Sequence, residues 1–442
     1  MEGQNNMKQR ISIFWFRRDL RLEDNHGLFK ALTSSNKVLP IFIFDTEILK
    51  QFPDIYDKRI SFIFQTLEDI NSKLSKEYQS SIKYFYGNPI EVFKSLKETY
   101  IIDSLYFNQD YEPYAIKRDK EIEDFLTENN TKVFCFKDST IFHKDEVRKP
   151  DSKPYTVYTP YSKVWLEKFK ETEIEHYPSE KYLSNLLSLE NNNFDLEHIG
   201  YKPCGDSFPK YIIDEDIIIN YENTRDKPYL EKGVSRVGVE LRFGRISIRN
   251  LVETANRLSL IYLKELIWRE FFMQILYHFP YVENSCFKSK YNRISWGNNE
   301  ELFEKWCEGM TGYPIVDAGM RELNSTGFMH NRVRMITASF LTKHLFIDWR
   351  WGELYFANKL LDYELSSNNG NWQWVAGSGC DASPYFRIFN PITQQKKFDP
   401  GFIYIKKWVP EFGTKDYPKP IIDHSFARNR TLSRFKKDLE NE

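Results

Sequence analysis

The first 140 residues alternate between short apolar runs and longer amphipathic stretches. ISIFWF from Ile11, KVLPIFIFD ending at Asp45, SIKYFYG, IDSLYFN and TKVFCF are typical of buried strands. Between them, stretches such as RISFIFQTLEDINSKLSKEY and AIKRDKEIEDFL carry apolar residues at helical spacing. Because parallel strands need helical crossovers, residues 1–140 are predicted to form a doubly wound parallel-sheet α/β domain, Rossmann-like in architecture. No GxGxxG follows the first strand, so the usual dinucleotide fingerprint is absent.

The pattern changes twice after this domain. Residues 141–210 contain prolines and polar runs, which favours a long connector with little core of its own. From residue 211 to 442 helical periodicity returns, in stretches such as YLKELIWREFFMQILYHF and NRVRMITASFLTKHLF. The sequence therefore predicts a second, all-helical domain over 211–442.

Composition narrows the class of protein. The chain has 442 residues, of which 41% are hydrophobic and 28% charged, as in globular domains. No apolar run approaches 18 residues and the first ten residues lack a signal-like stretch, so we expect a cytoplasmic protein without a membrane span. The net charge of −1 disfavours a globally basic nucleic-acid binder but is compatible with a local basic face.

The spacing of the cysteines and the distribution of the tryptophans along the chain each bear on the class of protein. Five cysteines lie far apart with no CxxC spacing, so we expect free thiols and neither a disulfide framework nor a metal site. Eight of the ten tryptophans fall at or after Trp268, which gives the C-terminal half a distinct role.

The stretch KELIWREFFMQIL holds the first candidate site. On a helix, Glu265, Trp268, Arg269 and Phe272 share one face. One interpretation is a Glu265–Arg269 helix pair beside a core tryptophan. The other is a base-recognition site, in which the indole stacks and the carboxylate accepts or donates hydrogen bonds.

Three further stretches combine polar groups in ways that suit a ligand. Arg332 and Arg334 in FMHNRVRM suit phosphate or carboxylate binding, or a solvated helix face. GVSRVG, from Gly233, offers backbone donors ahead of a helix, as a phosphate site or a capped turn does. Asp362, Glu364 and Asn368 precede a tryptophan-rich run and suit either a heterocycle and ribose or a helix cap.

Six of these motifs occur together in one order: WFRRDLRLEDNHGL, ELIWREFF, TGYPIVDAGMREL, TGFMHNRVRM, WRWGELYF and NNGNWQW. With them the chain resembles the photolyase/cryptochrome family from about Ile11 onward, most closely the class I cyclobutane pyrimidine dimer photolyases. The resemblance implies an N-terminal antenna domain, a connector, and a helical domain that binds FAD and DNA. It implies light-dependent repair of pyrimidine dimers by electron transfer from reduced FAD.

The resemblance also implies roles for individual residues. Asn368 faces the flavin, and Glu265, Asn331 and Asn368 are the catalytic candidates. The implied FAD-binding residues are Tyr221, Val234, Ser235, Arg236, Val237, Gly238, Tyr262, Glu265, Arg269, Arg334, Asp362, Tyr363, Glu364 and Asn368. The implied dimer- and DNA-binding residues are Arg225, Glu265, Trp268, Asn331, Arg332, Met335, Trp374 and Gln394. Trp372, Trp349 and Trp296 match the electron-transfer chain to the surface.

Several positions depart from the family pattern. The phosphate segment reads Val234–Gly238 where T-S-x-L-S is common, so backbone amides are expected to do more of the binding. Pro113 and Tyr114 stand near where folate-binding relatives carry an Asn-Glu pair, so folate is disfavoured and a deazaflavin, a second flavin or an empty antenna site stays open.

Two alternative functions within the family are a six-four photolyase and a cryptochrome photoreceptor. Six-four enzymes generally carry a His pair in the segment that here reads MHNRVRM, where one His330 precedes Asn331. Cryptochromes often add a long C-terminal tail, and this chain ends with TLSRFKKDLENE. We therefore expect a dimer photolyase that acts on DNA as a monomer without an obligate protein partner, at the nucleoid if the source is bacterial.

Overall fold

The computed structural model describes residues 8–35, 37–190 and 194–440. They fall into two compact units, each formed from three stretches of chain. The first comprises Met1–His143, Glu171–Ile212 and Val237–Glu253; the second comprises Lys144–Lys170, Ile213–Arg236 and Thr254–Glu442. The division predicted from the sequence, at 1–140, 141–210 and 211–442, is linear, whereas these units are interleaved: both share the connector range. Residues 191–193 of that connector lie outside the described residues.

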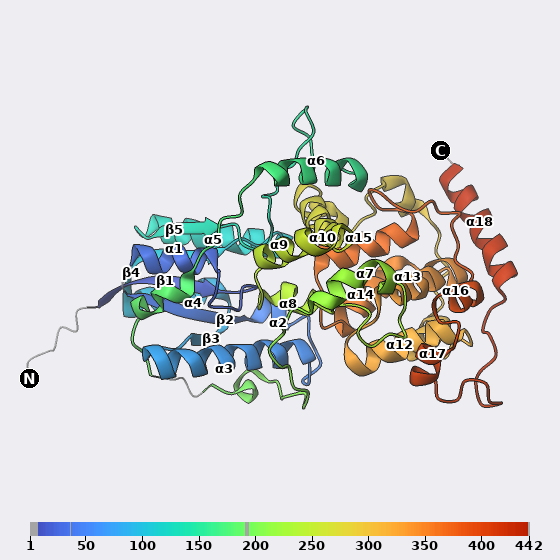
Figure 1. Ribbon diagram of the computed structural model, residues 1–442, viewed down its shortest axis with the longest axis horizontal. Coiled ribbons are helices and arrows are strands. Elements are labelled where there is room, and N and C mark those ends of the chain that lie inside the picture. The colour runs from blue at the N-terminus through green and yellow to red at the C-terminus, as the bar shows by residue number, and fades with distance from the viewer. Residues whose placement is uncertain (1–7, 36, 191–193, 441–442) are drawn as a thin grey trace, which may run out of the picture. The chain divides into compact units, whose positions relative to one another are not determined.

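The first unit contains the sheet, which is parallel with strand order β3-β2-β1-β4-β5 (Figure 1). The strands are β1 (Gln9–Phe16), β2 (Val38–Asp45), β3 (Lys83–Gly87), β4 (Tyr100–Asn108) and β5 (Lys132–Phe136). The order reverses between β1 and β4, which defines a doubly wound sheet. The prediction of this architecture is confirmed.

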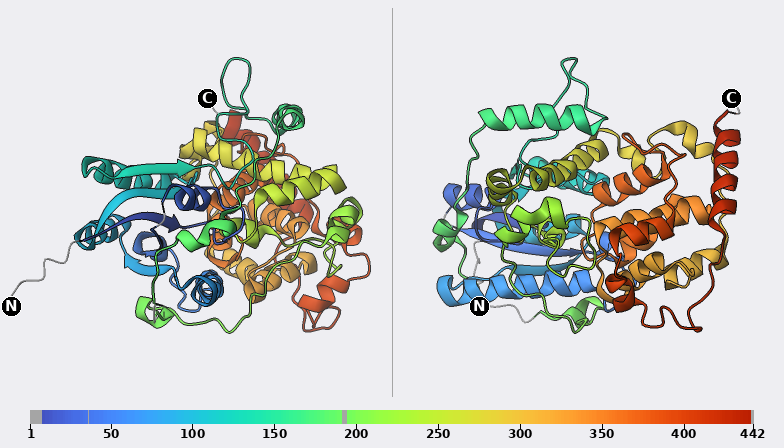
Figure 2. Two further views of the ribbon diagram at one scale, coloured as in Figure 1. Left: turned by 60° about the vertical axis from the view of Figure 1, so that its left-hand side comes forward. Right: turned by 45° about the vertical axis from the view of Figure 1, so that its right-hand side comes forward.

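Helices cover both faces of the sheet (Figure 2). Those of the first unit are α1 (His26–Ser34), α2 (Thr46–Leu49), α3 (Lys58–Tyr78), α4 (Pro89–Thr99), α5 (Pro113–Glu128), η1 (Ser179–Asn185), η2 (Leu196–Ile199) and α8 (Gly238–Phe243). On one face, Ile13 and Trp15 of β1 pack with Phe93 of α4 and Ile122 of α5 in a single core. Every residue of β2 is buried, as its continuous apolar run predicts for a central parallel strand.

The second unit is rich in helices, as predicted, and its described residues contain no β-strand beyond an isolated bridge between Arg148 and Pro154. Its α-helices are α6 (Tyr158–Glu171), α7 (Glu215–Thr224), α10 (Leu260–His278), α11 (Glu300–Glu308), α12 (Pro314–Thr326), α13 (Asn331–Ser339), α14 (Trp349–Lys359), α15 (Leu365–Ala376), α16 (Pro391–Phe398), α17 (Ile403–Trp408) and α18 (His424–Glu440). Its short elements are η3 (Pro280–Glu283), η4 (Ser289–Arg293) and the π-helical η5 (Phe340–Leu345). Helix α9 (Ile248–Leu258) runs from the first unit into the second.

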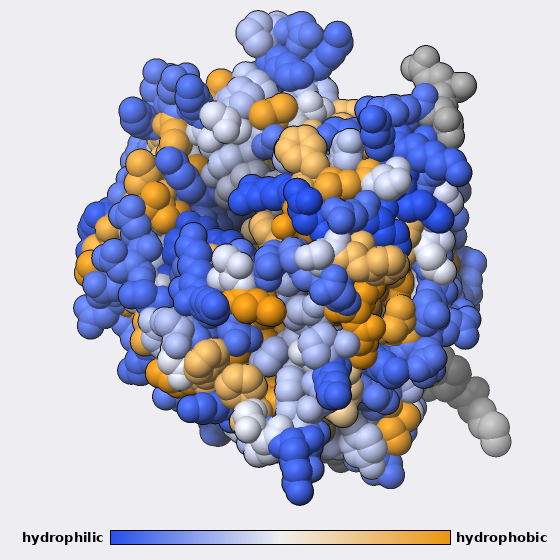
Figure 3. All heavy atoms as spheres, turned by 90° about the vertical axis from the view of Figure 1, so that its right-hand side faces the viewer, coloured by the Kyte–Doolittle hydropathy of each residue, from blue (hydrophilic) through white to orange (hydrophobic). Residues whose placement is uncertain are grey.

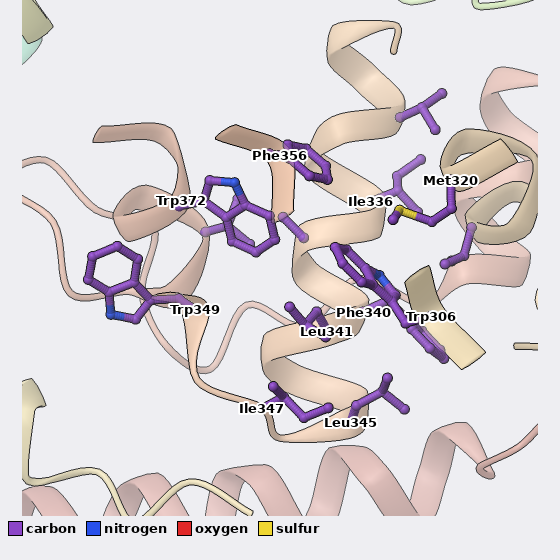
Figure 4. Close-up of a cluster of buried hydrophobic side chains, with 14 of the residues drawn as sticks. Trp306, Met320, Ile336, Phe340, Leu341, Leu345, Ile347, Trp349, Phe356 and Trp372 are labelled. Atoms are coloured by element: carbon purple, nitrogen blue, oxygen red, sulfur yellow. The ribbon is translucent and has the colours of Figure 1, made fainter. Parts of the chain in front are cut away.

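Helix α15 lies against α10 and α14, and two glycines permit the close approach. A Cβ on Gly370 of α15 would stand 2.2 Å from the ring of Phe272, and one on Gly352 of α14 would stand 2.2 Å from the Trp372 ring. These contacts hold the tryptophan-rich helix α15 firmly in place. Trp372 enters the main hydrophobic core there, together with Trp306, Phe356 and their neighbours (Figure 4).

The cysteines, the helices and the surface of the protein have the features expected of a globular protein. All five cysteines are free thiols, as expected. Across the described residues, no helix combines the length and apolar character that crossing a bilayer would need. On the face shown in Figure 3, hydrophilic side chains predominate and hydrophobic ones form separate groups between them.

Candidate active site

A cavity of about 430 Å³ opens into the second unit, within the range of cofactor and small-molecule sites. Its walls come from α10, α13, α14 and α15 and from the loop between α14 and α15. The sequence-predicted residues that line it are Arg225, Glu265, Trp268, Arg269, Asn331, Arg332, Arg334, Met335, Asp362, Tyr363, Glu364, Asn368, Trp372 and Trp374. Segments separated by up to 150 residues of sequence therefore meet at one site.

Helix α10 contributes one face to the cavity, at the spacing predicted from its sequence. Glu265, Trp268, Arg269 and Phe272 all line the wall. Glu265 does not pair with Arg269 one turn away: its Oε1 lies 2.7 Å from Nη1 of Arg225, at the end of α7. The Arg269 guanidinium instead lies 3.6 Å from the carboxylate of Glu364.

The Glu265 carboxyl is poised between two opposing influences. Burial raises its pKa above the ordinary value, and the charge and hydrogen bond of Arg225 act against that shift without cancelling it. Any ligand that displaced Arg225 would remove the stabilising charge and favour the protonated, hydrogen-bond-donating form of Glu265.

Both arginines of α13 are held by ion pairs. Arg334 donates through Nη2 to both oxygens of Asp362, at 2.9 and 3.1 Å, and through Nε to the Met329 carbonyl. Arg332 donates through Nε and Nη2 to Oδ1 of Asp226, at 3.0 and 2.8 Å. The alternative of a purely solvated helix face therefore does not describe either side chain.

His330 forms the N-cap of α13 and stays neutral. Its Nδ1 accepts a hydrogen bond from the backbone N–H of Arg332, and burial lowers its pKa to about 4. An uncharged imidazole at this point leaves the positive charge of the cavity to the arginines.

Asn368 is oriented by a carboxyl that the sequence analysis did not single out. Its Nδ2 donates to the backbone oxygen of Glu353 at 3.1 Å and to the Glu353 side chain at 2.9 Å. With the amide hydrogens used in this way, Oδ1 of Asn368 remains as an acceptor. Burial, opposed by the Asn368 hydrogen bond and reinforced by Glu283, raises the pKa of Glu353 to about 7.

Trp268 is backed by a second ring. Tyr158 of α6 stacks on it with ring centroids 3.5 Å apart and planes 6° apart, and the Tyr158 hydroxyl donates to the Lys264 carbonyl. The stack fixes the indole plane and covers one of its faces. Sequence reasoning missed Tyr158, because it lies 110 positions away in the predicted connector.

The predicted phosphate segment lies apart from the cavity lining. Ser235 and Tyr262 share a hydrogen bond of 2.8 Å between their hydroxyls, and the Tyr221 ring meets that of Tyr262 edge-on at 5.0 Å. Arg236 adopts a left-handed backbone conformation, with φ of 53°, and its guanidinium lies 4.4 Å from the Phe328 ring centroid. Val234, Ser235 and Arg236 belong to the second unit, whereas Val237 and Gly238 belong to the first.

The remaining predicted residues lie elsewhere in the second unit. Trp349 is buried in the main core, and Trp296 is packed against that core while partly exposed. Gln394 lies on α16 and is not among the residues that line the cavity.

Several lining residues were not predicted as site residues. They are Ala338, Phe356, Leu360, Ser367, Asn371 and Val375. Helical spacing points to Ala338, Asn371 and Val375, which lie one turn beyond Met335, Asn368 and Trp372. Nothing in the sequence links Glu353 to Asn368.

Among the described residues, no three or more His, Cys, Asp or Glu side chains are grouped so that they could hold a metal ion.

Comparison with known proteins gives a consistent result. Residues 12–180 match the family model described as DNA photolyase, and residues 262–415 match the FAD binding domain of DNA photolyase. A deoxyribodipyrimidine photo-lyase of Synechococcus sp. is 35% identical over 95% of both chains, and that of Escherichia coli is 35% identical over 96% of this chain and 98% of its own.

Solved structures agree with the sequence relatives. A class III photolyase from Agrobacterium tumefaciens superposes with a TM-score of 0.86 at 30% identity, covering 99% of both chains. An archaeal photolyase from Sulfolobus tokodaii, described with two FAD molecules, gives a TM-score of 0.83 at 34% identity over 97% of this chain and all of that one. The motifs, the two-unit fold and near-complete coverage by these relatives lead to one conclusion: the chain belongs to the photolyase/cryptochrome family.

Proposed function

We propose that this chain is a deoxyribodipyrimidine photo-lyase that repairs cyclobutane pyrimidine dimers in DNA with light and FAD. The observation that carries the proposal is that the cavity is lined by two chemically different sets of residues, one polar and one apolar or aromatic. One set of lining residues, Asn368, Asp362 and Arg334, suits a polar heterocycle. Another, Trp268, Met335 and Trp374, presents apolar and aromatic surface to a pyrimidine dimer flipped out of the duplex.

The residues present fit a reduced flavin. Because both hydrogen bonds from Nδ2 of Asn368 go to Glu353, its Oδ1 is left as the atom that can accept from a ligand in the cavity, which matches the N–H that a flavin gains on reduction. The Arg334–Asp362 pair adds a charge-neutral edge that donates and accepts. Bound and reduced, FAD would supply the single light-driven electron that splits the dimer.

The lesion is held by rigid aromatic surface and by one tunable carboxyl. Trp268, fixed by Tyr158, offers a stacking plane at low entropic cost. When DNA binds Arg225 and breaks its ion pair with Glu265, the raised pKa of Glu265 favours the protonated carboxyl. The protonated carboxyl then donates a hydrogen bond to the dimer and stabilises the negative charge that develops there. Asn331 and Met335 complete the proposed dimer pocket.

Phosphate binding rests on a small basic rim rather than on net charge. Arg225, Arg332 and Gln394 are the proposed DNA contacts. The carboxylates of Glu265 and Asp226 pair with the two arginines in the structure, and DNA phosphates are proposed to take the place of these carboxylates on binding. Ser235, Tyr262, Tyr221 and Arg236, with the backbone of Val234, are proposed to hold the FAD phosphates.

A second chromophore is the least defined part of the proposal. The Sulfolobus tokodaii relative is described with a second FAD as a light-harvesting cofactor. We propose that any antenna of this chain is a flavin or deazaflavin rather than a folate, since α5 begins at Pro113 and Tyr114 where folate binders carry Asn and Glu. We further propose that the protein acts as a monomer in the cytoplasm.

The decisive experiment separates the three family functions. The reduced, FAD-loaded protein is illuminated with one oligonucleotide that carries a cyclobutane dimer and another that carries a six-four lesion. Repair of the first alone supports the proposal, repair of the second alone makes the chain a six-four photolyase, and repair of neither favours a cryptochrome. A single His330 beside Asn331 and Met335 favours the first outcome.

A further inference from the structure

The two tryptophans of the proposed lesion pocket lie on different helices. Trp268 is on α10 and Trp374 is in the last turn of α15, and both line the cavity. A lesion contacts both rings only while the two helices keep one spacing and each ring keeps one orientation. The close contact of Gly370 with Phe272 joins the helices once. A second connection runs through the first residue of α6.

Tyr158, which begins α6, is bound to α10 at two points. Its ring stacks on Trp268 with centroids 3.5 Å apart, and its hydroxyl donates to the Lys264 carbonyl at 2.8 Å. Burial, reinforced by the Glu265 carboxyl, raises the pKa of this hydroxyl above its ordinary value. The hydroxyl therefore keeps its proton near neutral pH, and the ring that backs Trp268 stays in place.

Tyr158 is also bound to the loop that follows α15. Its backbone N–H donates to Oδ2 of Asp381 at 3.0 Å, a contact between positions 223 residues apart. This N–H belongs to the first turn of a 14-residue helix, where it has no partner within the helix and where negative charge is favourable. Asp381 thus ties the start of α6 to the C-terminal end of α15.

The loop that carries Asp381 folds back on Trp374. The backbone N–H of Ser383 donates to the Trp374 carbonyl at 3.2 Å. The Arg387 guanidinium, from the same loop, lies 5.9 Å from the Trp374 ring centroid. A displacement of Asp381 would therefore reach both the backbone and the ring of Trp374.

We propose that Tyr158 and Asp381 form a clamp that holds Trp268 and Trp374 in the arrangement that a pyrimidine dimer needs. The inference deepens the proposed repair function and rests on it. Both are positioning residues, since neither is among the described residues that line the cavity. Because the clamp orders the two indoles before DNA arrives, their loss of side-chain freedom does not weaken lesion binding.

The clamp favours damaged over undamaged DNA. A flipped dimer enters the cavity and contacts the two indoles, whereas an intact duplex is held through its phosphates. Loosening the clamp should therefore weaken binding of the dimer and leave binding of intact DNA unchanged.

Binding of oligonucleotides in the dark to the FAD-loaded protein tests this selectivity. Tyr158→Leu removes the stacked ring and should weaken affinity for a dimer-containing oligonucleotide about threefold to tenfold, because the indole must then be ordered on binding. Asp381→Ala removes the acceptor and should weaken it about twofold to threefold. Tyr158→Phe and Asp381→Asn keep the ring and the acceptor oxygen, and both should restore the parental affinity.

Repair kinetics in dim light provide a second readout. Slow photochemistry makes KM equal to the dissociation constant, so Tyr158→Leu should raise KM by the same factor as in the dark and leave kcat within about twofold of the parent.

Tyr155→Leu is the matched control, because it alters a buried tyrosine in the same segment. The Tyr155 ring packs against Tyr161, and its backbone carbonyl, which accepts from Gln274 at 2.9 Å, remains in the variant. Tyr155→Leu should lower the thermal midpoint as Tyr158→Leu does, and it should keep the parental preference for the dimer.

Fluorine NMR of protein labelled with 5-fluorotryptophan examines the clamp without DNA. Trp268→Phe and Trp374→Phe assign the two resonances. Tyr158→Leu should shift and broaden the Trp268 resonance, Asp381→Ala should alter both resonances, and Tyr155→Leu should alter neither.

Two results would overturn the proposal. One is an unchanged Trp268 resonance in Tyr158→Leu. The other is an equal loss of affinity for damaged and intact DNA, or a parent protein with no preference between them. Failure of the proposed function is scored separately: a parent protein that prefers the dimer in the dark but, once reduced and illuminated, repairs none would refute repair and leave the clamp standing.

Discussion

Replacing Glu353 by glutamine tests whether the half-buried carboxyl that orients Asn368 lowers the stability of the folded protein when it ionises. Glu353 accepts from Asn368 at 2.9 Å, in surroundings that raise its pKa from the ordinary 4.5 to about 7. Glutamine keeps an acceptor oxygen and nearly the same volume, and it carries no titratable proton. The two proteins should differ mainly in how their stability depends on pH.

The sign follows from proton binding. Between pH 4.5 and about 7 the native protein keeps a proton on Glu353 that the unfolded chain has released, so the free energy of unfolding falls as pH rises through this window. Above about pH 7 both states are ionised and the loss is complete. At 1.36 kcal/mol per pH unit, the interval corresponds to about 3 kcal/mol as an upper limit.

Urea denaturation at pH 5, 6, 7 and 8 with saturating FAD would measure the effect. Nine of the ten tryptophans lie in the second unit, so tryptophan fluorescence reports on the unit that holds Glu353. The difference in unfolding free energy, Glu353→Gln minus parent, should grow by about 2 to 3 kcal/mol from pH 5 to pH 8. Glu300→Gln, on the exposed side of α11, controls for the loss of one negative charge.

A difference that stayed constant across this pH range would refute the reasoning. It would mean that Glu353 titrates in the folded protein as it does in the unfolded chain, and that its burial carries no electrostatic cost. A lower stability of Glu353→Gln at every pH would instead assign the residue a packing role.

Three further changes address other parts of the site. Glu265→Gln should bind dimer-containing DNA normally and lose repair yield about twofold to fivefold, because a neutral donor remains; complete inactivity would contradict a supporting role. Arg334→Lys removes the planar fork that holds Asp362 and the Met329 carbonyl, and should speed FAD release about tenfold in a fluorescence assay, with an unchanged rate counting against the ion pair. Asp226→Asn frees Arg332 and should tighten DNA binding about twofold to fivefold at low salt, with a steeper salt dependence in titrations. Equal affinities would remove Arg332 from the phosphate contacts.

The fold could be predicted where one local pattern decides the outcome. Apolar runs of strand length separated by amphipathic helices leave a doubly wound sheet as the natural arrangement, and β2, buried at every residue, follows directly from its unbroken apolar run. The division of the chain is different. The 141–210 range reads as one polar connector, yet its α6 packs in the second unit while the residues from Glu171 to Ile212 join the first. Polar composition reveals that a segment has little core of its own, and it does not reveal which core its few apolar side chains enter.

The site divides in the same way. Residues on one helical face, such as Glu265 and Trp268, are placed together by periodicity alone, and the resemblance supplies positions such as Asn368. Partners across elements are a matter of tertiary geometry. At i and i+4, Glu265 and Arg269 satisfy every local rule for an ion pair, yet Glu265 bonds to Arg225.

The cause of that choice lies in desolvation. A pair within one helix gains only a few tenths of a kcal/mol, because both side chains can remain in water. A carboxyl that must line a partly buried cavity needs whichever cation reaches it with the best geometry, since an unpaired charge there costs far more. The side chains whose pairing departs from the helix rule are therefore ones that line the cavity, where burial raises the pKa of Glu265. Glu265 and Arg269 both belong to that group, and Glu265 is also a residue that the proposed photochemistry uses.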